Sequence, residues 1–171
     1  MKLPLLTACI SFWMVAFNVA FAEPQDELTK AVVEYEVTLP RVEAYAGALG
    51  DLVTWSRTHQ KESQLFRDKN NRITSLDDAA KRLESVPGIK AILDAHQITG
   101  KDMSLMPMAL LSSRAVVFAE KRGMTMPPGQ SNAASVAMVR ANDAKIEKLL
   151  EAIMTHLRTL RGADKENHVN P

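Results

Sequence analysis

The sequence contains very little cysteine: Cys9 is the only one among 171 residues. Cys9 lies within residues 1–22, a segment that we expect to be removed on export. A mature chain without cysteine cannot form disulfides, thiolate metal sites or covalent c-type haem attachments, and it has no cysteine nucleophile. Any chemistry at a functional site must therefore use other side chains.

The sequence also lacks an excess of charge of either sign. It has 21 Lys and Arg against 20 Asp and Glu, and removal of Lys2 with the leader would leave 20 against 20. A nucleic-acid-binding protein needs surplus basic residues to displace phosphate counterions, so nucleic-acid partners are not expected. A hydrophobic share of 46% and a charged share of 24% are ordinary for a globular domain and exclude disorder throughout the chain.

Motifs of common catalytic sites are missing as well. There is no G-x-S-x-G turn for a serine nucleophile, and neither H-E-x-x-H nor E-x-x-H occurs. The adjacent Asp77 and Asp78 are typical of a helix start, where they complement the positive end of the helix dipole. Glu147 and Glu151 alternate with lysines, as on a solvated helix face. We therefore expect a protein that is not an enzyme.

Residues 1–22 have the pattern of a secretory signal peptide. Lys2 provides the positive start, Leu5–Val19 is an apolar core, and Ala20-Phe21-Ala22 is an A-x-A cleavage site. The mature protein is predicted to begin at Glu23, to be periplasmic and to have no stable membrane insertion. Two alternatives are an uncleaved anchor over Leu3–Ala22 and lipidation of Cys9.

The mature chain is predicted to be all-α: a single-domain helical bundle over residues 23–162 with a disordered tail at 163–171. Its three long and two short helical segments follow from apolar residues repeated at steps of three and four. Pro40 should bend or break the first long segment, and residues 67–74 form a polar connection. The last of the long segments is expected to be one helix that carries a single stripe over 136–160, made of Val136, Val139, Ile146, Leu150, Ile153, Leu157 and Leu160.

Helix ends are marked by capping patterns. Ser75 with Asp78, and Thr99 with Asp102, have capping-box spacing, and Pro87 suits the first turn of a short helix. Gly123 is a natural stop for the helix that begins near residue 99, and Ser131 or Asn132 should cap the last long helix. The apolar stretch 103–119 contains Arg114, so we expect a helix buried among others and not a membrane span.

Three segments resemble a group of small exported bacterial helical proteins known only as hypothetical. They are VPGIKAILDAHQITGKDM (86–103), the MAL run at 108–110, and PPGQSNAASVAMVRANDAKIEKL (127–149). The resemblance covers roughly residues 75–150. It implies an exported helical domain, implies no activity and transfers no functional residue.

Histidine offers little for a metal or haem site. His59 and Glu62 have a spacing that could bind a metal from one helix face, but they stand among basic residues. His96 ends a short helix, and His156 lies beside the last apolar stripe. Structural roles are the expected ones. A noncovalent haem or other cofactor held by a His/Met pair is an alternative.

Methionine is unusually concentrated: five fall within 24 residues, namely Met103, Met106, Met108, Met124 and Met126. Thioethers are soft ligands that suit Cu(I), so periplasmic copper handling is an alternative function. Met also fills irregular core gaps, such as those around the kink expected at Pro107, and this packing role is the preferred interpretation. No metal ligand is assigned.

These observations predict a non-enzymatic protein that binds either a protein partner or a small ligand through a face that the sequence does not identify. The loop at 124–132, MTMPPGQSN, could be a recognition surface or a stiff connector between two packed helices. The sequence does not specify an oligomeric state.

Overall fold

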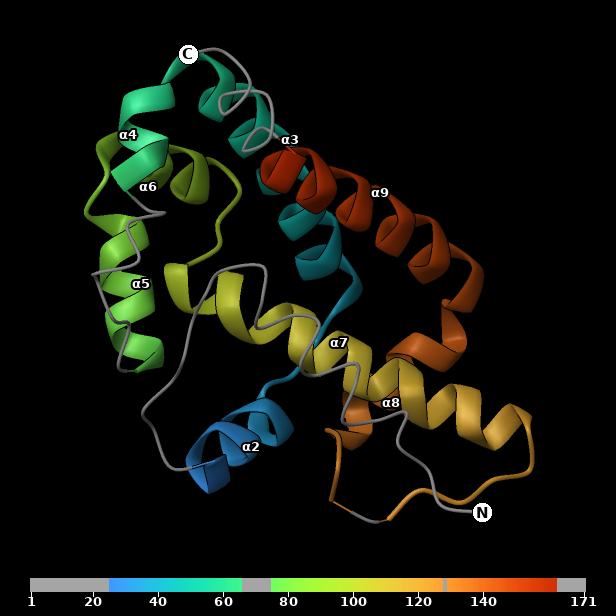
Figure 1. Cartoon of the computed structure of the whole chain (residues 1–171). Coiled ribbons are helices and arrows are strands. Elements are labelled where there is room, and N and C mark those ends of the chain that lie inside the picture. The colour runs from blue at the N-terminus through green and yellow to red at the C-terminus, as the bar shows by residue number, and fades with distance from the viewer. Residues whose placement is uncertain (1–24, 66–74, 128, 163–171) are drawn as a thin grey trace.

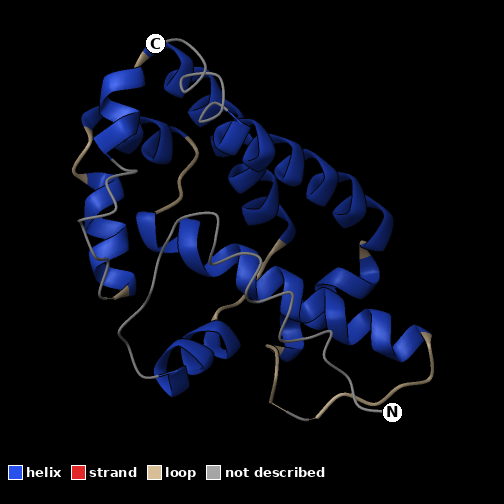
Figure 2. Ribbon diagram, in the orientation of Figure 1, coloured by secondary structure: helices blue, strands red, loops and turns tan. Residues whose placement is uncertain are grey.

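The structure is a computed structural model that describes residues 25–65, 75–127 and 129–162. The predicted signal peptide at 1–22, the polar connection at 67–74 and the tail at 163–171 lie outside the described residues. The predicted all-α fold is confirmed, because the described residues form eight helices and no strand (Figure 2).

The three longest helices build most of the molecule. They are α3 (Leu39–Thr58), α7 (Gly100–Lys121) and α9 (Asp143–Gly162). α9 lies along α3, and α7 passes below this pair in the view of Figure 1. Two contacts show that α3 and α9 run in the same direction. Near the start of both helices, Glu43 pairs with Lys145 at 2.5 Å. Further along both helices, Gly50 of α3 faces the His156 ring of α9.

Five shorter helices complete the fold: α2 (Gln25–Glu34), α4 (Gln60–Leu65), α5 (Leu76–Glu84), α6 (Pro87–Ala95) and α8 (Ala133–Ala141). α5 and α8 make the most extensive contacts with α7, while α6 packs on both α3 and α5. α2 lies on the side of α7 away from α9 (Figure 1). The core therefore centres on α7, with Leu49, Leu93, Met106, Leu110 and Ile153 almost completely buried.

Several predicted helix ends are confirmed in detail. The Ser75 hydroxyl accepts a hydrogen bond from the Asp78 amide at 3.1 Å. Thr99 and Asp102 form a complete capping box at the start of α7, and Asn132 caps α8. Gly123 has a φ of 68°, the left-handed conformation that lets a chain leave a helix without strain.

The break expected at Pro40 is also present. α2 ends at Glu34, and α3 begins at Leu39 with Pro40 in its first turn, where its missing N–H breaks no helical bond. The extended linker at 35–38 is held to α8. The Val37 amide donates to the Ser135 hydroxyl oxygen at 2.8 Å, and both residues are buried.

The prediction of a single helix over 136–160 is wrong, since α8 ends at Ala141 and α9 begins at Asp143. Asn142 makes the break. Its backbone and side-chain nitrogens donate to the Met138 carbonyl, and its own carbonyl accepts hydrogen bonds from the Lys145 and Ile146 amides in the first turn of α9. Most of the stripe is nevertheless buried on both sides of the break, because α8 packs on α7 and α9 packs on α3. Leu150 and Leu160 are the two members that are only partly buried. A periodic pattern cannot show such a change of axis.

The apolar stretch 103–119 lies within α7, which is the one described helix long and apolar enough to cross a membrane. In this fold, 56% of its most apolar window is buried. A helix that is apolar almost all round is suited to contact neighbours on several sides, as α7 does with α2, α3, α5 and α8.

Candidate ligand-binding cleft

A cleft of about 670 Å³ separates α7 from α9. This volume is within the range of about 300–1,000 Å³ typical of small-molecule sites. Most of the wall is apolar, and each of the two helices also contributes charged or polar side chains to it. We call this the α7–α9 cleft; it is lined by Tyr45, Pro107, Leu110, Leu111, Arg114, Glu147, Leu150, Glu151, Ile153, Met154, Thr155 and Arg158.

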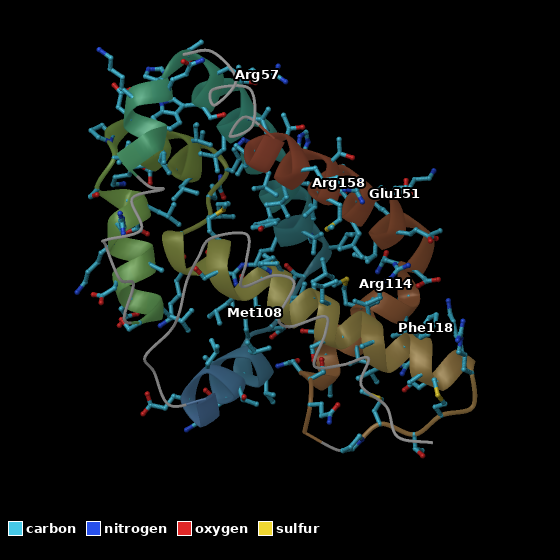
Figure 3. All side chains as sticks on the ribbon, viewed as in Figure 1. Arg57, Met108, Arg114, Phe118, Glu151 and Arg158 are labelled. Atoms are coloured by element: carbon cyan, nitrogen blue, oxygen red, sulfur yellow. The ribbon has the colours of Figure 1, made fainter. Side chains whose placement is uncertain are left out.

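Spacing along two helices explains this lining. Leu110 and Leu111 lie three and four residues after Pro107, and Arg114 lies four and three residues after them, so all four share one face of α7. The α9 residues repeat similarly from Glu147 to Arg158. Figure 3 shows Arg114 on α7 across from the labelled residues of α9. The two faces therefore meet as an apolar slot with charged groups along it.

Tyr45 reaches this cleft from α3 and is only 1% exposed. Its hydroxyl has no hydrogen-bond partner among the described residues. Burial raises the pKa of Tyr45 well above its usual value, and the negative form of the nearby Tyr35 would raise it further. The phenol therefore keeps its proton over the physiological range and presents an O–H donor without an acceptor.

Arg114 presents a second unpaired donor. Its Nη2 lies 3.5 Å from a carboxylate oxygen of Glu147, longer than the 2.7–2.9 Å usual for a charge-assisted hydrogen bond. Its Nη1 is buried and has no acceptor in the part of the chain that is described. A buried donor left without an acceptor costs about 1–3 kcal/mol. Two residues that line the cleft thus carry buried donors without acceptors among the described residues.

The cleft lining contains equal numbers of positively and negatively charged side chains. Arg114 and Arg158 contribute two positive charges, and Glu147 and Glu151 contribute two negative ones. Neither Glu151 nor Arg158 forms an ion pair with another described residue, and both lie on α9 in Figure 3. The cleft as a whole is therefore neutral, with its most buried positive group on α7.

The five methionines singled out in the sequence are separated along α7. Met103 and Met106 are core residues at 3% and 0% exposure, whereas Met108 is half-buried and does not line the cleft. The Met124 amide donates to the Ala119 carbonyl at 2.9 Å, at the far end of α7. Ala119 is thirteen positions after Met106, which corresponds to about 20 Å along the helix. The five sulfur atoms therefore do not converge on one site.

The described histidines have partners of other kinds. His96 Nε2 lies 2.8 Å from an Asp51 carboxylate oxygen, so it links α6 to α3. The His59 ring stacks on Trp55 with centroids 4.9 Å apart. Within the described ranges, no three His, Cys, Asp or Glu side chains are grouped so as to hold a metal ion.

On the other side of α7, the predicted Thr99–Asp102 cap is part of a larger polar network around the buried Asp102, and its contacts with Tyr35 and Arg41 were not predicted. The Tyr35 hydroxyl donates to Asp102 Oδ1 at 2.5 Å, and the Thr99 hydroxyl donates to Oδ2 at 2.8 Å. Burial alone would raise the pKa of Asp102, but these hydrogen bonds and the positive charge of Arg41 lower it below its usual value. Asp102 thus serves the cap of α7 and anchors the linker that follows α2.

The loop after α7 is attached to that helix. The Ser112 hydroxyl donates to the Gln130 carbonyl, and Ser113 and Ser131 share a hydrogen bond of 2.9 Å. Met124, at 43% exposure, is one of two large apolar side chains that are clearly exposed among the described residues; Phe118 is the other. These contacts favour the connector interpretation for the described part of 124–132.

Sequence reasoning did not identify Tyr45 or recognise Arg114 as part of a site. The signal that was available was the single arginine within the apolar stretch 103–119. Comparison with protein-family models, with curated proteins and with solved structures finds no match to this chain. The geometry of the cleft is therefore the basis for a functional proposal.

Proposed function

We propose that this chain is an exported, non-enzymatic binding protein that holds a small amphipathic molecule in the α7–α9 cleft. One observation carries the proposal. Two donors without acceptors, the Tyr45 hydroxyl and Arg114 Nη1, belong to residues that line the same cleft. A ligand with an apolar body and an acceptor group would bury its body in the slot and pair with these donors.

Binding, and not catalysis, is the function that fits these residues. A catalytic site needs a nucleophile or a general base in hydrogen-bond reach of an activating group. Tyr45 holds its proton too tightly to serve as a base, because burial raises its pKa, and a guanidinium offers donors but no acceptor. Both can position a ligand, which is the role of convergent polar groups in an apolar pocket.

The experiment is a calorimetric titration of the protein with 1-anilinonaphthalene-8-sulfonate, an apolar molecule with an anionic acceptor group. We expect saturable binding of one molecule per chain. A Met154→Trp variant should fill part of the cleft and abolish binding. A Met108→Trp variant is the control, because Met108 is also half-buried but lies outside the cleft lining.

Absence of saturable binding, or equal loss in both variants, would refute the cleft as the ligand site. Export is tested separately by the intact mass of the protein recovered from the periplasm. A mature chain that begins at Glu23 is expected. Retention of residues 1–22, or a lipid attached to Cys9, would refute this part of the proposal.

A further inference from the structure

Two buried side-chain atoms of the α7–α9 cleft lack partners among the described residues, the Tyr45 hydroxyl and one guanidinium nitrogen of Arg114. Both can donate a hydrogen bond, and the guanidinium nitrogen can only donate. A matching ligand group must therefore bring acceptors and need not bring a donor. Carboxylate, sulfonate and phosphate groups meet this requirement, whereas an amide would add donors of its own.

The charges of the cleft distinguish among these three kinds of ligand group. Arg114 has a side-chain exposure of 30%, so its positive charge is partly removed from water. Its ion-pair partner Glu147 lies 3.5 Å away, and a second carboxylate, Asp143, is near enough for the Arg114 charge to help lower its pKa but pairs with Lys121. This charge is incompletely neutralised. Glu147 and Glu151 stand on the facing helix, so a dianion would meet more repulsion than a monoanion. A planar guanidinium also matches the two oxygens of a carboxylate.

We propose that the α7–α9 cleft selects an apolar monocarboxylate, and that the ligand carboxylate replaces Glu147 as the partner of Arg114. This inference rests on the proposed function, since it assumes that the cleft binds a small molecule. In the free protein a Glu147 carboxylate oxygen lies 3.5 Å from Arg114 Nη2, and 60% of the Glu147 side chain is exposed. It is a weak internal competitor that can turn into solvent when a ligand enters.

The test uses the full exported protein and two probes of the same shape, 2-naphthoate and the neutral 2-naphthamide, measured by calorimetry. The acid should bind about tenfold or more tightly than the amide, because a hydrogen bond to a charged group is the stronger one. Equal affinities would overturn the selection of a carboxylate while leaving the cleft as a binding site. Binding of neither probe would refute the proposed function itself.

Variants of two cleft glutamates distinguish competition by Glu147 for Arg114 from a general effect of removing negative charge. In Glu147→Gln the internal competitor of Arg114 is gone, so 2-naphthoate should bind several-fold more tightly and 2-naphthamide unchanged. Glu151→Gln removes the same charge from the same helix without touching Arg114, and should have a clearly smaller effect. Equal tightening in the two variants, or weaker binding of the acid in Glu147→Gln, would overturn the displacement of Glu147.

Discussion

The unpaired hydroxyl of Tyr45 makes an unusual prediction: its removal should stabilise the free protein. In Tyr45→Phe the ring that fills the core is kept, and only the buried oxygen without an acceptor is lost. The desolvation cost of that oxygen, about 1–3 kcal/mol, should then be recovered as free energy of unfolding. Most core substitutions change stability in the opposite direction.

Tyr35 supplies a matched control. It lies ten residues earlier in the chain, but its hydroxyl donates to the Asp102 carboxylate. Tyr35→Phe removes a hydrogen bond to a charged group and leaves a buried carboxylate with one donor fewer, at a cost of about 1.5–3 kcal/mol. The same chemical change at two tyrosines should thus shift stability in opposite directions.

Thermal unfolding followed by circular dichroism measures both effects. Each kcal/mol corresponds to a change of about 2–4 °C in the melting temperature of a domain of this size. Tyr45→Phe should melt above the wild type and should bind 2-naphthoate more weakly. A Tyr45→Phe protein that melts several degrees lower would show that the hydroxyl has a partner in the free protein, which would remove the main support for the cleft as a site.

Three further outcomes are expected. Leu157→Ala should lower the free energy of unfolding by about 2–5 kcal/mol in urea denaturation, since Leu157 is a core residue; an unchanged midpoint would contradict the core assignment. Met106→Leu should cost less than about 1.5 kcal/mol and leave Cu(I) affinity unchanged in chelator competition, whereas loss of tight, stoichiometric binding would establish copper handling instead. Because the pKa of Asp102 is lowered, its stabilising contribution exists above about pH 4 and disappears as the pH falls through the native pKa. Asp102→Asn should therefore be less stable at neutral pH and lose less stability on acidification; a variant that loses as much stability as the wild type on acidification would contradict this role of Asp102.

Local sequence patterns were sufficient for the fold class and for most helix ends. The caps at Ser75, Thr99 and Asn132 each use a side chain and an amide two or three residues away, so the interaction is contained in the sequence spacing. The break near Pro40 is equally local, because proline lacks the amide donor that a helix interior needs.

The break at Asn142 shows where local patterns stop being sufficient. The apolar spacing continues from Val139 to Ile146 as in one helix, yet two different partners, α7 and α3, bury its two halves. An asparagine within a helical pattern is compatible with a continuous helix or with a break, since its side chain can hydrogen-bond to the backbone of the preceding turn. Packing against the rest of the protein decides between them.

The composition by itself determined which chemistries are absent from residues 23–171, because a site cannot use cysteine that is not there. The order of the residues determined the helical class, because apolar periodicity is a local property of the sequence. Only the tertiary structure brought Tyr45 of α3 and Arg114 of α7, which are 69 positions apart in the sequence, to a common cleft with α9. Whether a buried donor finds an acceptor depends on every element that surrounds it, and such partners have no fixed spacing in sequence.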